Sequence, residues 1–201
     1  NSIISSSGAL NVVIWTDAGD SGRSSHIDIS GTTITTNGGH VWMGGGAQAT
    51  WNGIAVGSRS ANTWSDNVQG IDLSSSIITT GSGQISLSGK SHVSGGTNTG
   101  SSNMGVSLVG STLSSTSGDI TLNGELRGIY THGYGVLIDA SSLVQSGSGN
   151  ITINATSADQ AGSAQGWRHG VGVYGTIKST SGAIELTGTA TTTYSNNDSG
   201  A

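Results

Sequence analysis

One short pattern occurs six times in this chain of 201 residues: an aliphatic residue, a turn rich in Ser and Thr, a glycine, and an alternating apolar strand. The clearest copy is STLSSTSGDITLNG (111–124), where Leu113 precedes Gly118, and Ile120 and Leu122 close the unit. In each copy the first aliphatic residue stands seven positions before the first member of the closing pair. Such self-similarity is typical of proteins built by stacking one structural unit.

A further apolar-x-apolar strand, such as Ile71-Asp72-Leu73, precedes each later copy. Each unit is therefore expected to hold three short strands and a loop of variable length. One unit offers only about five inward aliphatic side chains, so it needs stacked neighbours to bury them. We predict an all-β parallel β-helix of about six coils, with the loops at one corner and a small extra strand at GIAVG (53–57). The predicted repeat units of this single domain are 2–31, 32–75, 76–110, 111–141, 142–174 and 175–201.

Alternate residues of a strand face opposite sides of the sheet. The aliphatic residues are therefore predicted to face inward, and the intervening Thr, Ser, Asn and Asp residues to face outward. The predicted core is Ile34, Val41, Met43, Ile71, Leu73, Ile78, Ile85, Leu87, Val106, Leu108, Leu113, Ile120, Leu122, Val136, Ile138, Val144, Ile151, Ile153, Val171, Val173, Ile177, Ile184 and Leu186.

The glycine of the repeat is expected at a corner that needs either a positive φ or a close approach of two backbones. These turn glycines are Gly8, Gly39, Gly83, Gly118, Gly149 and Gly182. The chain contains no proline, which fits a structure whose interior strands all donate their N–H groups.

The composition excludes several classes of protein. A net charge of -5 argues against nucleic-acid binding, which needs a basic face. No run of 18 apolar residues is present, so we predict no membrane span. Only 8% of the residues are charged, but the apolar residues are regularly spaced, which argues against disorder. Neither an initiator Met nor a signal-peptide pattern opens the chain, so we expect a processed form or a piece of a longer protein.

Two stretches, GVSLVGSTLSSTSGDITLNG (105–124) and YGVLIDASSLVQSGSGNITINA (134–155), resemble the repeats of filamentous-haemagglutinin-type exoproteins and of bacterial β-strand-repeat surface proteins. The resemblance implies a right-handed, roughly triangular β-helix. It also implies secretion to the bacterial cell surface and a role in adhesion or in extracellular fibres. The amino-terminal secretion domain of such exoproteins is not recognisable here, so the resemblance does not extend to the route of export.

The sequence predicts a structural function without catalysis. The pattern supplies only five strands of the kind that precedes each later copy, and neither end carries a charged or helical cap. We expect either a subunit that stacks head-to-tail on further copies of itself into a fibre, or a section of a longer adhesin. No cofactor is expected.

Aromatic residues in the connections between units are candidates for contact with a neighbouring subunit or with cell-surface glycans. A third interpretation is that they cover small cores within the loops themselves. The candidate residues are Trp51, Trp64, Tyr130, Tyr134 and Trp167.

An enzyme that degrades polysaccharides is the least favoured alternative, because such enzymes need clustered carboxylates. Asp28 and Asp72 occupy the same outward position of consecutive units, but Ser107, Leu137 and Gly172 continue the row. Three histidines also precede equivalent strands, in units that are not all adjacent. These are His26, His132 and His169. We predict no catalytic residue and no metal site.

Overall fold

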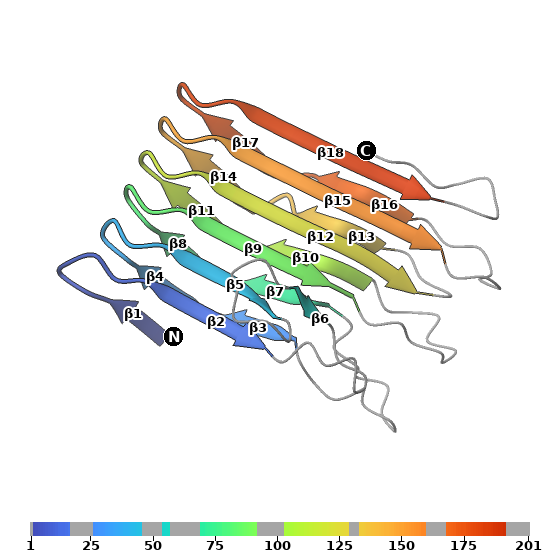
Figure 1. The fold of residues 1–201 in the computed structure, drawn as a ribbon, viewed down its shortest axis with the longest axis horizontal. Helices are drawn as coiled ribbons and strands as arrows, with labels where there is room; N and C mark the ends of the chain where they lie inside the picture. Colours follow the sequence, from blue (N-terminus) through green and yellow to red (C-terminus); the bar gives the residue numbers. More distant parts are fainter. Residues whose placement is uncertain are drawn as a thin grey trace.

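The computed structural model describes residues 2–16, 26–45, 54–56, 69–91, 103–128, 133–159 and 168–191. In these ranges every regular element is a β-strand, and every strand pairing is parallel. Three sheets stack their strands along one common axis, as Figure 1 shows. The predicted fold class, an all-β parallel β-helix, is confirmed. No helix in the described part of the chain has the length and apolarity to cross a membrane.

Each sheet collects one strand from successive coils, and its strands are ordered along the axis as they are in the chain. Sheet A contains β1 (Ser2–Ser5), β4 (Thr32–Thr35), β8 (Ile77–Thr79), β11 (Thr112–Ser115), β14 (Leu143–Ser146) and β17 (Thr176–Ser179). Sheet B contains β2 (Val12–Thr16), β5 (Val41–Gly45), β9 (Ile85–Lys90), β12 (Ile120–Gly128), β15 (Ile151–Asp159) and β18 (Ile184–Thr191), with the short β6 (Ala55–Val56) beside β9. Sheet C contains β3 (Ile27–Ser30), β7 (Ile71–Ser74), β10 (Asn103–Val109), β13 (Gly133–Ile138) and β16 (Arg168–Val173).

The number of complete coils is slightly smaller than predicted. Within the described ranges, five coils contain a strand of each sheet, and the first coil contains only β1 and β2. In Figure 1 the strands of sheet B run to the right in front, and the chain returns to the left behind them while it advances upward. The coil is therefore right-handed. The connections of variable length all lead from sheet B to sheet C.

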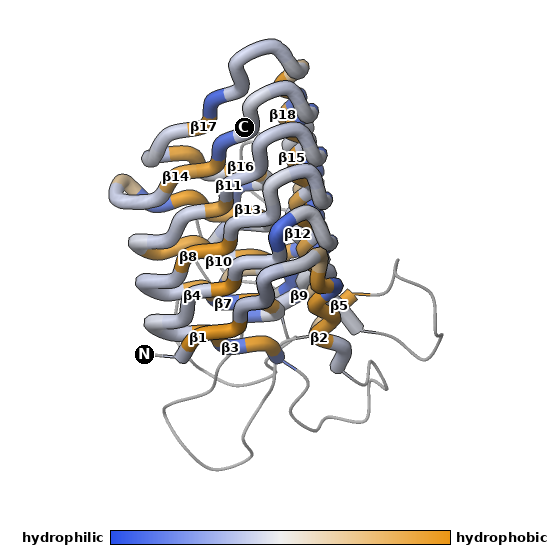
Figure 2. Tube along the Cα trace, turned by 90° about the vertical axis from the view of Figure 1, so that its left-hand side faces the viewer, coloured by the Kyte–Doolittle hydropathy of each residue, from blue (hydrophilic) through white to orange (hydrophobic). Residues whose placement is uncertain are grey.

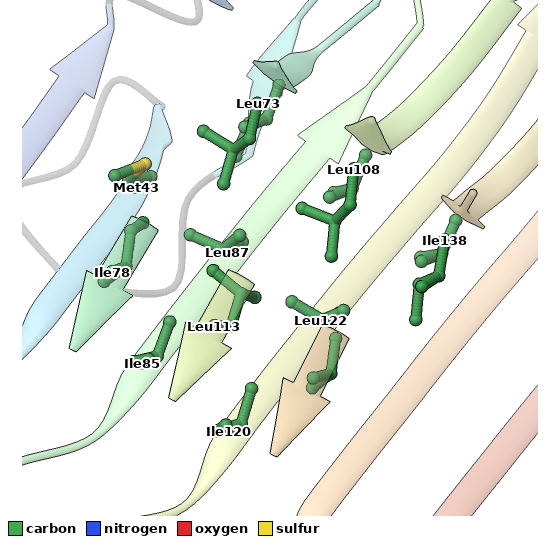
Figure 3. Close-up of a cluster of buried hydrophobic side chains, with 14 of the residues drawn as sticks. Met43, Leu73, Ile78, Ile85, Leu87, Leu108, Leu113, Ile120, Leu122 and Ile138 are labelled. Atoms are coloured by element: carbon green, nitrogen blue, oxygen red, sulfur yellow. The ribbon is translucent and has the colours of Figure 1, made fainter. Parts of the chain in front are cut away.

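The interior is a set of aliphatic columns that run parallel to the axis. The strands pair in register, so equivalent residues stack: Ile85, Ile120 and Ile151 form one column of sheet B, which continues to Val41 and Val12 on one side and to Ile184 on the other. Figure 2 shows the apolar residues of successive coils above one another, and Figure 3 shows the side chains packed between the sheets. All predicted core residues from Ile34 to Val171 are buried, and Ile177 packs half-buried against them.

Three residues predicted to lie in the core are exposed instead. Val173, Ile184 and Leu186 retain 38%, 43% and 42% of their accessible surface. All three belong to the last described coil, where β16 and β18 are the final strands of sheets C and B. A residue in a stack of coils is covered from both sides, and these residues have a neighbouring coil on one side only.

The first coil is paired differently from the repeat pattern, in which Ile3 is equivalent to Ile34 and Leu10 to Val41. Ile4, not Ile3, pairs with Ile34, and Val12, not Leu10, pairs with Val41. The turn between the two strands is thus one residue longer in this coil, so the expected spacing of seven is wrong for the first copy. In consequence Gly8 does not align with the other turn glycines.

The remaining five turn glycines form a column in which backbones of successive coils touch. A Cβ atom on Gly83, Gly118, Gly149 or Gly182 would overlap the carbonyl oxygen of the preceding glycine, and one on Gly39 would overlap that of Leu10. Positive φ angles occur at other glycines, such as Gly38 and Gly81. Close backbone approach, and not a left-handed conformation, therefore explains why glycine recurs at this position of the repeat.

A second set of glycines, which the sequence prediction overlooked, brings sheets B and C together. A Cβ on Gly89 would overlap the carbonyl oxygen of Gly105, and one on Gly124 would overlap that of Gly135. The B strands continue beyond the apolar pair in this region, and β12 and β15 reach nine residues each. Each of these two B-strand glycines stands two residues after a buried leucine.

The corner between sheets C and A contains a column of buried serines. The Ser111 Oγ accepts a hydrogen bond from the Ser76 backbone N–H at 3.1 Å and donates to the Leu73 carbonyl at 2.9 Å. The Ser142 Oγ accepts from the Ser111 N–H at 3.0 Å in the same way. These hydroxyls satisfy backbone groups that the corner would otherwise leave buried without partners.

Replacement of Leu122 tests the inward assignment. We expect Leu122→Ala to lower the free energy of unfolding by about 2–5 kcal/mol because it leaves a cavity, and Leu122→Asp to abolish folding because it buries an unpaired charge. The matched variant Thr121→Asp changes the adjacent outward residue and should fold. Urea unfolding followed by circular dichroism measures all three. Equal loss of folding in both Asp variants would show that the two residues do not face opposite sides.

Substitution of a glycine from the column tests the close contact of coils. Gly118→Ala should destabilise the protein by about 1–3 kcal/mol, since the new methyl group overlaps a backbone carbonyl that cannot move freely. Gly8→Ala is the control, because nothing lies within 4 Å of the position that its Cβ would take. Its free energy of unfolding should stay within about 0.5 kcal/mol of the unchanged protein. Equal effects of the two substitutions would contradict the column.

Candidate functional surface on sheet C

Of the five loop aromatics predicted as contact residues, only Tyr134 belongs to the described part of the chain, where it lies on β13. Trp51, Trp64, Tyr130 and Trp167 lie outside the described residues. Tyr134 lies on the outer face of sheet C, and the carboxylates Asp28 and Asp72 belong to strands of the same sheet.

Tyr134 is the centre of an aromatic cluster formed with His169 and Tyr174. His169 pairs with Tyr134 in the neighbouring strand, and their rings stack with centroids 5.2 Å apart and an interplanar angle of 23°. Tyr174 meets Tyr134 edge-on at 6.1 Å, and the two hydroxyls are hydrogen-bonded at 2.6 Å. A Cβ on Gly172 would overlap the Tyr134 ring, so the glycine provides the space in which the ring lies.

The cluster is accessible from outside. Tyr174 keeps 63% of its surface exposed, and Tyr134 and His169 are half-buried. Burial raises the pKa of Tyr134 to about 12, with further contributions from the hydrogen bond with Tyr174 and from the charge of that residue. Sequence reasoning found Tyr134 but missed Tyr174 as its partner. The signal was the small residue at Gly172, where the other units carry Asp28, Asp72, Ser107 and Leu137.

The two carboxylates lie further along the same face. Asp28 and Asp72 are register partners in β3 and β7, and adjacent strands stand about 4.8 Å apart. Burial raises the pKa of Asp72 above its ordinary value, and the hydrogen bond with Ser107 opposes that rise. The charges of Asp28 and His26 act in smaller measure, the first raising and the second lowering the pKa. Asp28 itself is exposed.

The histidines are dispersed over the molecule. His26 precedes β3, His169 stacks on Tyr134, and His132 lies outside the described residues, as does His92. His40 belongs to the corner between sheets A and B, where its Nδ1 accepts a hydrogen bond from the Gln84 N–H at 3.0 Å. It also stacks on Trp42 at 4.9 Å. Within the described ranges, no three or more His, Cys, Asp or Glu side chains group in a way that could hold a metal ion.

A shallow depression of about 300 Å³ opens on sheet A. Serine and threonine hydroxyls line most of it, together with Gln145 and Lys178. Gln145 donates a hydrogen bond to Ser114 Oγ at 3.1 Å within this surface. The depression contains no aromatic side chain and no carboxylate, so it differs in chemistry from the outer face of sheet C.

The fold defines the class of the protein as a parallel β-solenoid built from sequence repeats. Comparison of the chain with protein-family models, with curated proteins and with solved structures finds no match.

The buried carboxylate predicts a pH dependence of stability. A raised pKa means that the folded protein holds the proton of Asp72 more tightly than the unfolded chain, so ionisation destabilises the fold as the pH rises above the ordinary value of 3.8. Asp72→Asn removes this effect. The free energy of unfolding of the variant, measured in urea from pH 3 to pH 7, should increase relative to the unchanged protein as the pH rises.

Asp139 supplies a control of opposite sign. Its partial burial raises its pKa, but hydrogen bonds from Ser142, Ser141 and the Gly110 N–H outweigh burial and hold the pKa below its ordinary value. Ionised Asp139 therefore stabilises the fold, and this contribution is lost as the pH falls through its lowered pKa. Asp139→Asn should be less stable than the unchanged protein near neutral pH, and the difference should shrink in acid. The same pH trend in both variants would contradict the assignment of the two carboxyl environments.

Proposed function

We propose that the protein is a non-enzymatic extracellular structural protein of the filamentous-haemagglutinin-like kind. It serves either as a subunit that assembles head-to-tail into a surface fibre or as a section of a long adhesin shaft at the bacterial cell surface. The observation that carries this proposal is the uniform stack: three parallel sheets continue through the coils with inward aliphatic residues in register.

The terminal coils support the proposal because they expose the residue type that internal coils bury. Leu186 ends a column that begins at Ile14 and includes Leu122. At the opposite end Ile4 is 38% exposed, although its partner Ile34 is fully buried. Another coil, from a longer chain or from a second copy, would extend both the columns and the hydrogen-bond ladders. Head-to-tail contacts of this kind grow into open filaments.

The outer rows of sheet B suit a shaft that lies beside others. Thr121 pairs with Thr152, and Asn154 donates a hydrogen bond to the Asn123 side chain at 3.2 Å. These four side chains are uncharged, although Glu185 ends the row of Thr121 and Thr152. Uncharged side chains produce little electrostatic repulsion between molecules, which favours association.

Electron microscopy over a range of concentrations, combined with one pair of variants, tests the assembly. The unchanged protein should form fibres with a subunit repeat of about 29 Å, the height of six coils. Leu186→Lys places a charge on the exposed end of the column and should prevent fibre growth. Thr187→Lys introduces the same charge at the adjacent exposed position, which pairs with the outward Asn154, and should leave the fibres intact.

Circular dichroism establishes that both variants fold. Discrete short rods at every concentration would contradict self-assembly and leave the section of a longer shaft as the structural role. Fibres that survive Leu186→Lys would show that association does not use the end of the column, and equal loss of fibres in both variants would show that the effect is not specific to the column.

A further inference from the structure

Two tyrosines of successive coils meet through their hydroxyl groups on the outer face of sheet C. Tyr134 lies on β13, and Tyr174 directly follows β16, the neighbouring strand of the sheet. Their hydroxyl oxygens are 2.6 Å apart, within the range of a hydrogen bond between two hydroxyls. The rings meet edge to face, with an interplanar angle of 89° and centroids 6.1 Å apart. The oxidisable ends of two phenols are therefore in direct contact.

We propose that this pair is a site of oxidative cross-linking, at which Tyr134 and Tyr174 are joined into a dityrosine. Each phenol gives up one electron and its hydroxyl proton and becomes a phenoxyl radical. A carbon–carbon bond then forms between ring carbons adjacent to the hydroxyl-bearing carbons, and the hydrogen on each coupled carbon moves to the oxygen to restore the phenol. The protein loses two hydrogen atoms in all. Hydrogen peroxide, acting through a haem peroxidase, accepts the two electrons and two protons and becomes two molecules of water.

The fold positions the two phenols before any oxidant acts. The Tyr174 N–H donates a hydrogen bond to the Ile138 carbonyl at 2.8 Å, which ties the backbone of Tyr174 to β13. The Tyr134 ring lies in the space that the missing side chain of Gly172 leaves, and the His169 ring stacks on it with centroids 5.2 Å apart. Groups held together in one molecule react with each other far faster than with groups on separate molecules. Coupling within the pair should therefore prevail over coupling between molecules.

The pair is accessible to an oxidant. Tyr174 keeps 63% of its surface exposed, so an electron acceptor can reach its ring. It follows the last residue of β16, and a tyrosine side chain turns about two bonds, so the exposed ring can rotate into the position for coupling. The two phenols lie on the side of the stack, and cross-linking is therefore independent of end-to-end assembly.

The new bond would fasten the last described strand of sheet C to its neighbour. Within the described ranges β16 is paired on one side only, and Val173 at its end is 38% exposed. Elements with few covering contacts open first when a protein fluctuates. The chain contains no cysteine, so a disulfide cannot tie these coils together. A bond between residues 40 positions apart would restrict the unfolded chain as a disulfide does.

Treatment of the protein with hydrogen peroxide and a haem peroxidase, followed by peptide mass spectrometry, tests the proposal. At a concentration below that of any fibre formation, we expect the monomer to lose two hydrogen atoms and to gain the blue fluorescence of dityrosine. The linked peptides should contain positions 134 and 174, although Tyr130 and Tyr194 are also present in the chain. The cross-linked protein should unfold at a higher urea concentration than the untreated protein. Tyr174→Phe changes an exposed residue and should leave Tyr134 without a link.

Gly172→Ala tests the geometry without removing a tyrosine. Its Cβ would overlap the Tyr134 ring and displace it, so the yield of the 134–174 link should fall about tenfold or more. Gly8→Ala, which meets nothing within 4 Å, is the control and should keep the full yield. Circular dichroism verifies that the variants fold. Absence of the 134–174 link, equal yields of links to Tyr130 or Tyr194, or an unchanged yield in folded Gly172→Ala would overturn the proposal.

Discussion

The in-register parallel hydrogen-bond ladder is the constraint on which this structure depends. It holds successive coils about 4.8 Å apart and places each residue above its equivalent in the previous coil. Aliphatic residues must then stack on aliphatic residues, as Ile85, Ile120 and Ile151 do. At one position of the corner between sheets A and B, the same constraint leaves no room for a side chain. The place that a Cβ on Gly118 would take is filled by the Gly83 carbonyl oxygen.

The ladder also explains where the molecule can vary. Inward positions and corners are occupied by residues that the stack demands, including the serine hydroxyls at Ser76, Ser111 and Ser142. Outward positions have no such requirement. A fold of this kind therefore offers a fixed interior and long outer faces on which chemistry can be placed, and the outer face of sheet C carries an aromatic cluster and a carboxylate pair.

Much of this architecture could be predicted from the sequence, because a repeated pattern reports the interior directly. Leu113, Ile120 and Leu122 were assigned to the core from alternation alone, and all are fully buried. Alternation could not reveal that the first turn is one residue longer, because Leu10 and Val12 both fit the apolar pattern and only the pairing with Val41 decides between them. Alternation also could not place Tyr174 beside Tyr134. That contact depends on a third residue, Gly172, whose missing side chain leaves the space in which the Tyr134 ring lies.

Distances between spin labels on the outer row of sheet B test the stacked ladder most directly. Ser86, Thr121, Thr152 and Glu185 are successive register partners, and the chain contains no cysteine, so pairs of cysteines introduced there can be labelled cleanly. Electron spin resonance should give backbone separations that increase in equal steps of about 4.8 Å, reaching about 14 Å between positions 86 and 185. Separations that do not increase in this order, or a much longer distance between those two positions, would contradict the parallel solenoid.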